Sequence, residues 1–107
     1  MSDTRNRVIE RYHTVTRRAD LHAPGVVKTL FKSYDRILQG LLPANMNASM
    51  LDAACGEGGL LLYLRQKGYE NLDGFDLSPE NVNLCHEVGL DFVKRWDVLK
   101  IDSYAGA

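Results

Sequence analysis

The chain has 107 residues, of which 45% are hydrophobic and 25% charged, and its formal net charge is −1. These values predict one small globular domain, and the sequence has no repeat and no low-complexity tract. No stretch approaches the roughly 20 apolar residues of a membrane span, and the polar N-terminus lacks a signal-peptide core. We therefore expect no membrane partner and a cytoplasmic location. Cys55 and Cys85 match no metal-site spacing and no disulfide framework, so no metal is expected.

The charge is unevenly distributed along the chain. Residues 1–40 hold eight Lys and Arg against four Asp and Glu, which gives +4, and residues 41–107 hold five against ten, which gives −5. A basic N-terminal segment could steer a nucleic acid or another acidic substrate. No basic cluster interleaved with aromatic residues supports that reading, so we favour a solvated helix face and do not expect a nucleic acid as partner.

The N-terminal part of the chain predicts two helices. Residues 4–19 form a polar helix candidate with weak periodicity, and residues 22–25 break it. Apolar residues then recur at steps of three and four from Val26 to Leu41, which predicts an amphipathic helix that packs on a sheet. We assign residues 1–44 to a helical cap and residues 45–107 to the main domain.

From residue 49 onward the pattern alternates between strand and helix. Gly68 is typical of a helix end, and Ser78 followed by Pro79 is typical of a helix start. Right-handed crossovers place the three strands in the spatial order 3-2-1, in an α/β, Rossmann-like three-layer sandwich with a parallel sheet. The expected strands are 49–54, 71–76 and 91–96, and the expected helices are 59–67 and 79–88.

The first strand leads into an acidic and glycine-rich turn, residues 51–59, with the sequence Leu-Asp-Ala-Ala-Cys-Gly-Glu-Gly-Gly. Glycines there let the backbone approach a ligand closely, and the free N–H groups of the following helix point the same way. In doubly wound sheets the ligand lies beyond the carboxyl ends of the strands, where the strand order reverses. The turn therefore predicts a nucleotide-type site.

The spacing of the glycines narrows the ligand class. Gly56 and Gly58 supply the first two glycines of a dinucleotide fingerprint, but Leu61 stands where the third is required. The chain also lacks the Gly-Lys-Ser/Thr ending of a phosphate-binding P-loop. A nicotinamide-dependent oxidoreductase is thus disfavoured, though it remains the third alternative.

Three segments in order carry a family resemblance. Residues 52–58 fit the pattern D/E-x-G-x-G-x-G with Ala54 in place of the first glycine, residues 74–80 read Gly-Phe-Asp-Leu-Ser-Pro-Glu, and residues 96–99 read Trp-Asp-Val-Leu. In these segments the chain resembles the class I S-adenosylmethionine-dependent methyltransferases, over residues 45–100. In that family a fourth strand would follow, so we expect the cofactor-binding, N-terminal half of a complete catalytic domain.

Chemistry and resemblance together suggest a role for each polar residue. A carboxylate can accept both hydroxyls of a ribose, which suits Asp76. The resemblance assigns the adenine amino group to Asp97, and Asp52 carries negative charge near the place where a sulfonium would lie. Aromatic residues of the N-terminal helix sometimes close such sites, which suggests Tyr12. The expected cofactor-binding residues are Tyr12, Asp52, Ala54, Cys55, Gly56, Gly58, Asp76, Leu77, Trp96, Asp97 and Val98.

The resemblance implies transfer of a methyl group from S-adenosylmethionine, with S-adenosylhomocysteine as product, to an unidentified acceptor such as a small molecule or a saccharide. No catalytic residue can be assigned, because acceptor-binding and base residues of this family usually follow later strands. The alternative is a non-catalytic nucleotide-binding or assembly module. The open edge of the first strand also predicts that the isolated chain self-associates.

Overall fold

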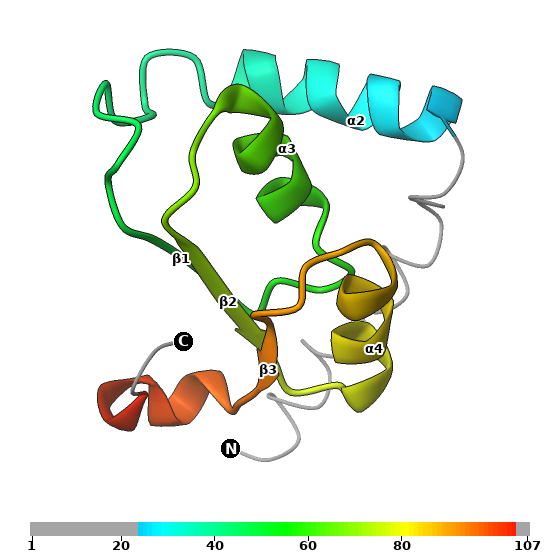
Figure 1. Ribbon diagram of the computed structural model, residues 1–107, viewed down its shortest axis with the longest axis vertical. Coiled ribbons are helices and arrows are strands. Elements are labelled where there is room, and N and C mark those ends of the chain that lie inside the picture. The colour runs from blue at the N-terminus through cyan, green and yellow to red at the C-terminus, as the bar shows by residue number, and fades with distance from the viewer. Residues whose placement is uncertain (1–23, 105–107) are drawn as a thin grey trace.

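The structure is a computed structural model that describes residues 24–104. The expected helix at 4–19, with Tyr12, lies outside the described residues. The described elements alternate between helix and strand along the chain (Figure 1), which confirms the α/β class. No helix in this part of the chain is long and apolar enough to cross a membrane.

A three-stranded parallel sheet forms the centre of the fold. Strand β1 is Met50–Ala53, β2 is Leu72–Asp76 and β3 is Lys94–Arg95, and they lie in the order β1-β2-β3. The expected parallel sheet and its 3-2-1 order are therefore confirmed. The register pairs Ala53 with Phe75 and Asp76 with Arg95. The carboxyl ends of all three strands thus reach the same edge of the sheet.

Strand β3 is shorter than the expected 91–96. The amide of Val93 donates to the carbonyl of Leu90 at 3.2 Å, and that of Leu90 donates to Cys85 at 2.9 Å. These local bonds form a turn that buries both apolar side chains under the preceding helix. The strand is therefore limited to two exposed basic residues, Lys94 and Arg95, which pair with β2.

The helices that follow β1 and β2 lie where the sequence predicts them. Helix α3 is Gly59–Lys67, and Gly68 after it is left-handed, with φ of 109°. Helix α4 is Pro79–Glu87, and the hydroxyl oxygen of Ser78 accepts a hydrogen bond from the Asn81 amide at 3.3 Å. Both ends are thus set by local sequence, a glycine C′ residue and a serine N-cap.

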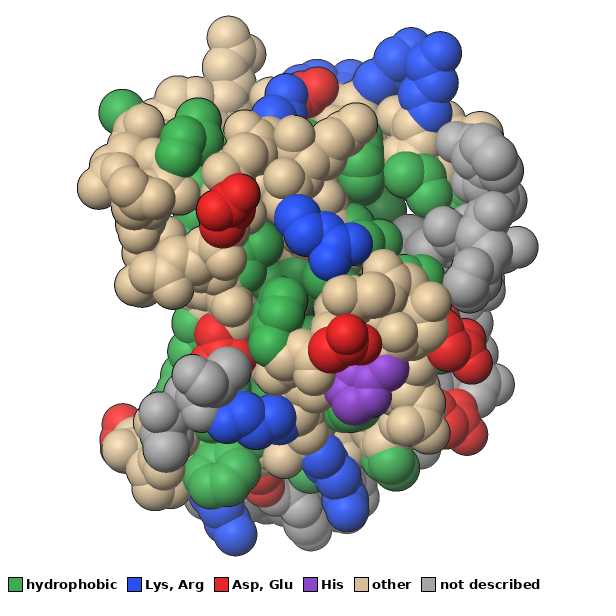
Figure 2. Space-filling view, viewed as in Figure 1, with side chains coloured by type: hydrophobic (Ala, Val, Ile, Leu, Met, Phe, Trp, Pro, Cys, Tyr) green, Lys and Arg blue, Asp and Glu red, His purple; other side chains and the backbone are tan. Residues whose placement is uncertain are grey.

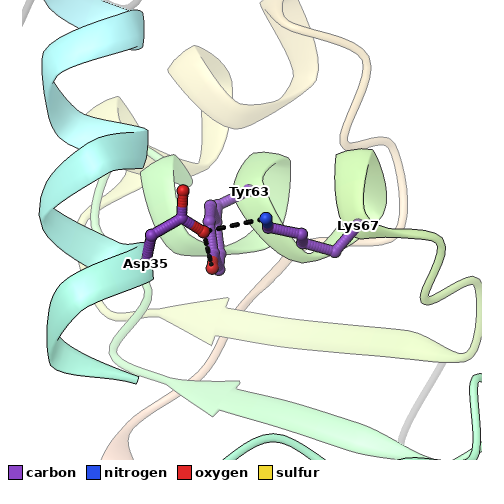
Figure 3. A network of polar contacts seen from close by, with 3 residues as sticks. All are labelled: Asp35, Tyr63 and Lys67. Atoms are coloured by element: carbon purple, nitrogen blue, oxygen red, sulfur yellow. Dashed lines mark hydrogen bonds and ion pairs between the residues drawn. The ribbon is translucent and has the colours of Figure 1, made fainter. Parts of the chain in front are cut away.

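Helix α2, Pro24–Ile37, packs across α3 (Figure 1). Its residues Phe31 and Tyr34 lie on the buried core, with ring centroids 5.6 and 5.3 Å from the ring of Tyr63. The hydroxyl of Tyr63 donates to Asp35 at 2.6 Å, and Lys67 forms an ion pair with the same carboxylate at 2.8 Å (Figure 3). A polar network therefore fixes this helix beside an apolar contact.

The opposite face of β2 has a separate apolar cluster. Alternate residues of a strand face opposite sides, so Asp73 and Phe75 point away from Gly74. The ring of Tyr104 packs 4.8 Å from that of Phe75, and its hydroxyl donates to Asp73 at 2.8 Å. Tyr104 directly follows η1, a 3-10 helix at Val98–Ser103 that the sequence did not predict. The sheet thus has α2, α3 and α4 on one side and Tyr104 on the other.

Candidate functional site

The turn between β1 and α3 winds through three left-handed residues. Ala54, Gly56 and Gly58 have φ of 59°, 59° and 93°. The amide of Cys55 donates to the carbonyl of Phe75 at 2.9 Å, which ties the turn to β2. A left-handed alanine is strained because its Cβ crowds the backbone. Ala54 therefore adopts the conformation that the glycine of the family pattern would adopt without strain.

The carboxylate of Asp76 holds this turn in place. Its Oδ2 accepts a hydrogen bond from the amide of Gly56 at 2.9 Å, and its Oδ1 accepts from the amide of Ser78 at 2.9 Å and from Nδ2 of Asn81 at 3.3 Å. The side chain is only 4% exposed. Asp76 thus connects the turn, β2 and the start of α4, and its suggested bond to a ribose stays a prediction.

Asn81 is a site residue that sequence reasoning missed. It is 1% exposed, and its Oδ1 is buried without a hydrogen-bond partner in the structure. A buried acceptor that lacks a donor costs about 1–3 kcal/mol. The only sequence signal is a polar residue on the same face of α4 as Cys85, four positions later, which faces the core. The amide lies against Asp76, where a donor from a ligand or a water would satisfy it.

Asp52, at the carboxyl half of β1, lies close enough to Asp76 for their charges to interact. Burial, and then the negative charge of Asp76, raise the pKa of Asp52 to about 6. Burial, and then the charge of Asp52, also raise the pKa of Tyr34. Two neighbouring carboxyl groups favour a cationic ligand. The aromatic residue that α2 brings to this site is Tyr34, which sequence reasoning missed.

Gly58 makes room for the core. A Cβ built on it would overlap Cδ1 of Leu90 and would lie 3.1 Å from Sγ of Cys85. Its φ of 93° is also unfavourable for any other residue. The space expected beside this glycine for a ligand is therefore filled by two buried side chains.

Leu61 takes the position of the third glycine in a dinucleotide fingerprint and is fully buried. A Cβ built on Gly74, in the middle of β2, would lie 2.7 Å from Cδ1 of Leu61. In the dinucleotide fingerprint, a glycine on the helix lets helix and strand approach closely. In this chain the glycine that allows this approach is Gly74, on the strand.

Cys55 and Cys85 are buried free thiols under the turn. The thiol of Cys85 donates to the carbonyl of Gly56 at 3.2 Å. A hydrogen bond with Cys85, and then burial, raise the pKa of Cys55 far above its usual range. A thiol with a raised pKa is a poor nucleophile. Cys55 therefore packs under the turn as a protonated thiol, and its suggested contact with the cofactor stays a prediction.

The third expected segment lies beside the same sheet edge. The amide of Trp96 donates to the carbonyl of Asp76 at 3.1 Å, so the end of β3 adjoins the end of β2. Oδ1 of Asp97 accepts a hydrogen bond from the amide of Leu99 at 3.0 Å, which caps η1. Val98 is 42% exposed, and Leu77 is partly buried. The suggested contacts of Leu77, Trp96, Asp97 and Val98 with the cofactor stay predictions.

The site is thus gathered by five described segments: the end of β1, the turn, the end of β2, the start of α4 and the side of α2. Of the expected residues, the structure brings together Asp52, Gly56 and Asp76 with Cys55 below them. Among residues 24–104 no group of three His, Cys, Asp or Glu could hold a metal ion.

Comparison with known proteins reveals two similar methyltransferases. The Type II methyltransferases M.HincII and M.HindII, both from Haemophilus influenzae, are each 31% identical to the chain over 67 residues. The resemblance to methyltransferases is confirmed. The aligned part covers 63% of this chain and only 13% of each relative, so the chain spans a small part of their length. No family model matches the chain.

These relatives correct one expectation. The sequence predicts no nucleic-acid partner, because the basic residues are not interleaved with aromatic ones. The Type II methyltransferases that resemble the chain are DNA methyltransferases, which contradicts that expectation. The physical reason is that charge patterning in a small segment reports only on that segment, whereas the relatives are several times longer.

Proposed function

We propose that the chain is the S-adenosylmethionine-binding part of a methyltransferase whose acceptor is DNA. The observation that carries the proposal is the junction between the 54–58 turn and Asp76, at the carboxyl end of a parallel sheet. Similarity to two Type II methyltransferases supports both the reaction and the acceptor class. A cytoplasmic location accords with the proposal, since Cys55 and Cys85 are free thiols.

The described residues suit a cationic nucleoside. When bound, S-adenosylmethionine supplies a methyl group that is already activated on a sulfonium. Asp52, with its raised pKa beside Asp76, gains most from a neighbouring positive charge. The unpartnered Oδ1 of Asn81 offers an acceptor next to Asp76. These residues would therefore hold the cofactor by charge and by hydrogen bonds.

Calorimetry with S-adenosylhomocysteine, and with NAD as control ligand, tests the proposal. We expect the 107-residue protein to bind S-adenosylhomocysteine and not NAD. Asp52→Asn should weaken binding of S-adenosylmethionine, whose sulfonium carries the positive charge, roughly 10- to 150-fold, because an interaction with a charged group contributes about 1.5–3 kcal/mol. Tight NAD binding, or S-adenosylmethionine binding unchanged in Asp52→Asn, would contradict it.

Asp76→Ala is a second variant with a different meaning. It should also lower the affinity roughly 10- to 150-fold, but it frees the amide of Gly56 as well, so its stability must be measured alongside. A variant that unfolds at the temperature of calorimetry indicates the structural role of Asp76. For that reason Asp52→Asn is the decisive variant.

A non-catalytic nucleotide-binding or assembly module is the second candidate. The internal hydrogen bonds of Asp76 favour the assembly role, because they leave the carboxylate little exposed to a ligand. Methyl transfer separates the two candidates. Tritium from labelled S-adenosylmethionine should enter duplex DNA when the natural protein that contains this chain is the enzyme.

A further inference from the structure

Three basic residues form a row along the outer side of α2. Lys28, Lys32 and Arg36 follow one another at four-residue spacing, so they lie on one helix face. All three are exposed. Figure 2 shows basic side chains gathered over α2, along the top of the molecule. We call these three residues the α2 basic row.

Within residues 24–104, the side chains of the α2 basic row do not help to hold the fold together. Arg65 donates to the carbonyl of Gly89 at 3.1 Å, Lys67 pairs with Asp35 at 2.8 Å and Nε of Arg95 donates to Leu77 at 3.0 Å. By contrast, no side chain of the row forms a hydrogen bond or ion pair within residues 24–104. In the part of the chain that the structure describes, its three charges are therefore left for a partner.

An acidic partner of extended shape fits this row best. Eight residues of helix span about 12 Å, at 1.5 Å per residue. One strand of duplex DNA carries a phosphate about every 3.4 Å along its axis, which places three to four phosphates along that length. Over this length, the three basic side chains therefore face about as many phosphates of one DNA strand.

A lipid surface fits the row less well. Membrane-surface helices bury an apolar face in the bilayer. The apolar face of α2 is already occupied, since Phe31 and Tyr34 pack on the core. A membrane would therefore meet only the charged side of the helix.

The position of α2 connects this row with the proposed site. Tyr34 faces inward and lies within electrostatic reach of Asp52, while the basic row faces outward on the same helix. The width of one helix, about 10–12 Å with side chains, separates the two. A polyanion on the outer side of α2 would therefore lie about one helix width from Tyr34 and the proposed site.

We propose that the α2 basic row binds the phosphate backbone of double-stranded DNA beside the cofactor site. The inference rests on the proposed function in one respect, since it takes DNA as the acceptor. It adds which surface of this chain meets the acceptor. Because the contact is with phosphates, it is independent of base sequence.

Fluorescence anisotropy with a labelled DNA duplex tests the inference, over a range of salt concentrations. The variant Lys28→Gln/Lys32→Gln/Arg36→Gln should lower the salt slope of log K by about 2.7, at roughly 0.9 per lost phosphate contact. A matched pair compares Lys32→Gln with Lys100→Gln, an exposed lysine on η1. The first should lower the slope by about 0.9, and the second should leave it unchanged.

Each outcome has a defined meaning. Equal slopes for wild type and the triple variant would overturn the inference, as would a wild type with no salt-dependent duplex binding. Binding to vesicles that contain phosphatidylserine, lost in the triple variant and without duplex binding, would also overturn it. Calorimetry of the triple variant with S-adenosylhomocysteine separates this from the proposed function. If the triple variant binds S-adenosylhomocysteine with the affinity of the wild type, its cofactor site is intact. A loss of duplex binding then reports on the DNA surface and not on the proposed function.

Discussion

Asp52 links the stability of the fold with the charge of its ligand. Burial and the neighbouring Asp76 raise its pKa to about 6, so its ionised form is costly in the free protein. A cationic ligand would relieve that cost. The same carboxylate should thus oppose folding and favour binding, which is typical of a residue retained for function.

The pH dependence of cofactor binding follows from this pKa. S-adenosylmethionine should bind the ionised form of Asp52, so its affinity should fall by about tenfold per pH unit below about pH 6. Asp52→Asn should bind more weakly and without this pH dependence. Calorimetry between about pH 5 and 8 measures both, and an affinity of the wild type that stays constant across pH 6 would contradict the role given to Asp52.

The stability of the free protein should respond in the opposite direction. The folded state holds the Asp52 proton more tightly than the unfolded state, so the free energy of unfolding falls as pH rises from about 4 to about 6 and stays lower above. Asp52→Asn should therefore be more stable at neutral pH, by an amount on the order of 1–3 kcal/mol. Urea unfolding should show that the difference disappears near pH 4.

Ala54 offers a test of strain in the turn. Its φ of 59° costs an alanine about 1–2 kcal/mol, and a glycine there costs about 0.5–1 kcal/mol in chain entropy. Ala54→Gly should therefore raise the free energy of unfolding by up to about 1 kcal/mol. Ala53→Gly, one residue earlier in β1, is the control and should lower it. Thermal unfolding of the two variants compares them directly, and a destabilised Ala54→Gly would argue against strain.

At the level of elements, α2 is held by a mixed contact. The ring of Phe31 packs on Tyr63. Asp35 accepts a hydrogen bond from the same tyrosine and forms an ion pair with Lys67. Asp35, as hydrogen-bond acceptor, raises the pKa of Tyr63 to about 12. The stability that this bond provides is present below the usual tyrosine pKa and is lost as pH rises through about 12.

Tyr63→Phe isolates the polar part of this contact. The ring stays and the hydrogen bond is lost, so Tm should fall by a few degrees. Asp35→Asn should have a smaller effect, because the side chain is exposed and its ion pair is screened by water. If α2 carries the DNA surface, Tyr63→Phe should not change the salt slope of duplex binding, because the basic row is untouched.

The elements that could be predicted from the sequence are those fixed by local signals. Gly68 ends α3 and Ser78 begins α4 through their own backbone or side chain, so both boundaries follow from residue type. The 3-10 helix and the short β3 could not be predicted in this way. The turn at 90–93 that shortens β3 carries no glycine or proline signal, and Tyr104, which follows the 3-10 helix, donates to Asp73, far away in sequence.

The candidate site shows the same division. The turn and Asp76 could be predicted from the sequence, because glycines directly after a strand and an aspartate at the end of the next strand form a recognisable pattern. The internal bonds of Asp76, the buried amide of Asn81 and the approach of Tyr34 from α2 arise only when three segments meet. A sequence records each of these residues but not their distances.

For the whole molecule, the sheet depends on cover from both sides. One side of the sheet has the helices. On the other side the ring of Tyr104 covers Phe75, and its centroid lies 5.8 Å from that of Trp96. Phe75 is fully buried although it lies outside the main core cluster. The residues after β3 are therefore part of the folded unit.

Tyr104→Ala should expose Phe75 and lower the free energy of unfolding by about 2–4 kcal/mol. Tyr104→Phe keeps the ring and loses only the hydrogen bond to Asp73, so its cost should be about 1 kcal/mol. Urea unfolding measures both values. Equal costs for the two variants would show that the hydrogen bond, and not the ring, provides the cover.

The contact between Leu61 and Gly74 has a consequence for how relatives of this chain diverge. The space between α3 and β2 admits one large side chain and one hydrogen atom, but it does not prescribe which element contributes which. The packing therefore constrains the combined volume of the two side chains. Substitutions should therefore arrive in pairs, with a small residue on the helix accompanied by a larger one on the strand. A sequence motif that scores each position separately would therefore miss such a relative, although its backbone would be the same.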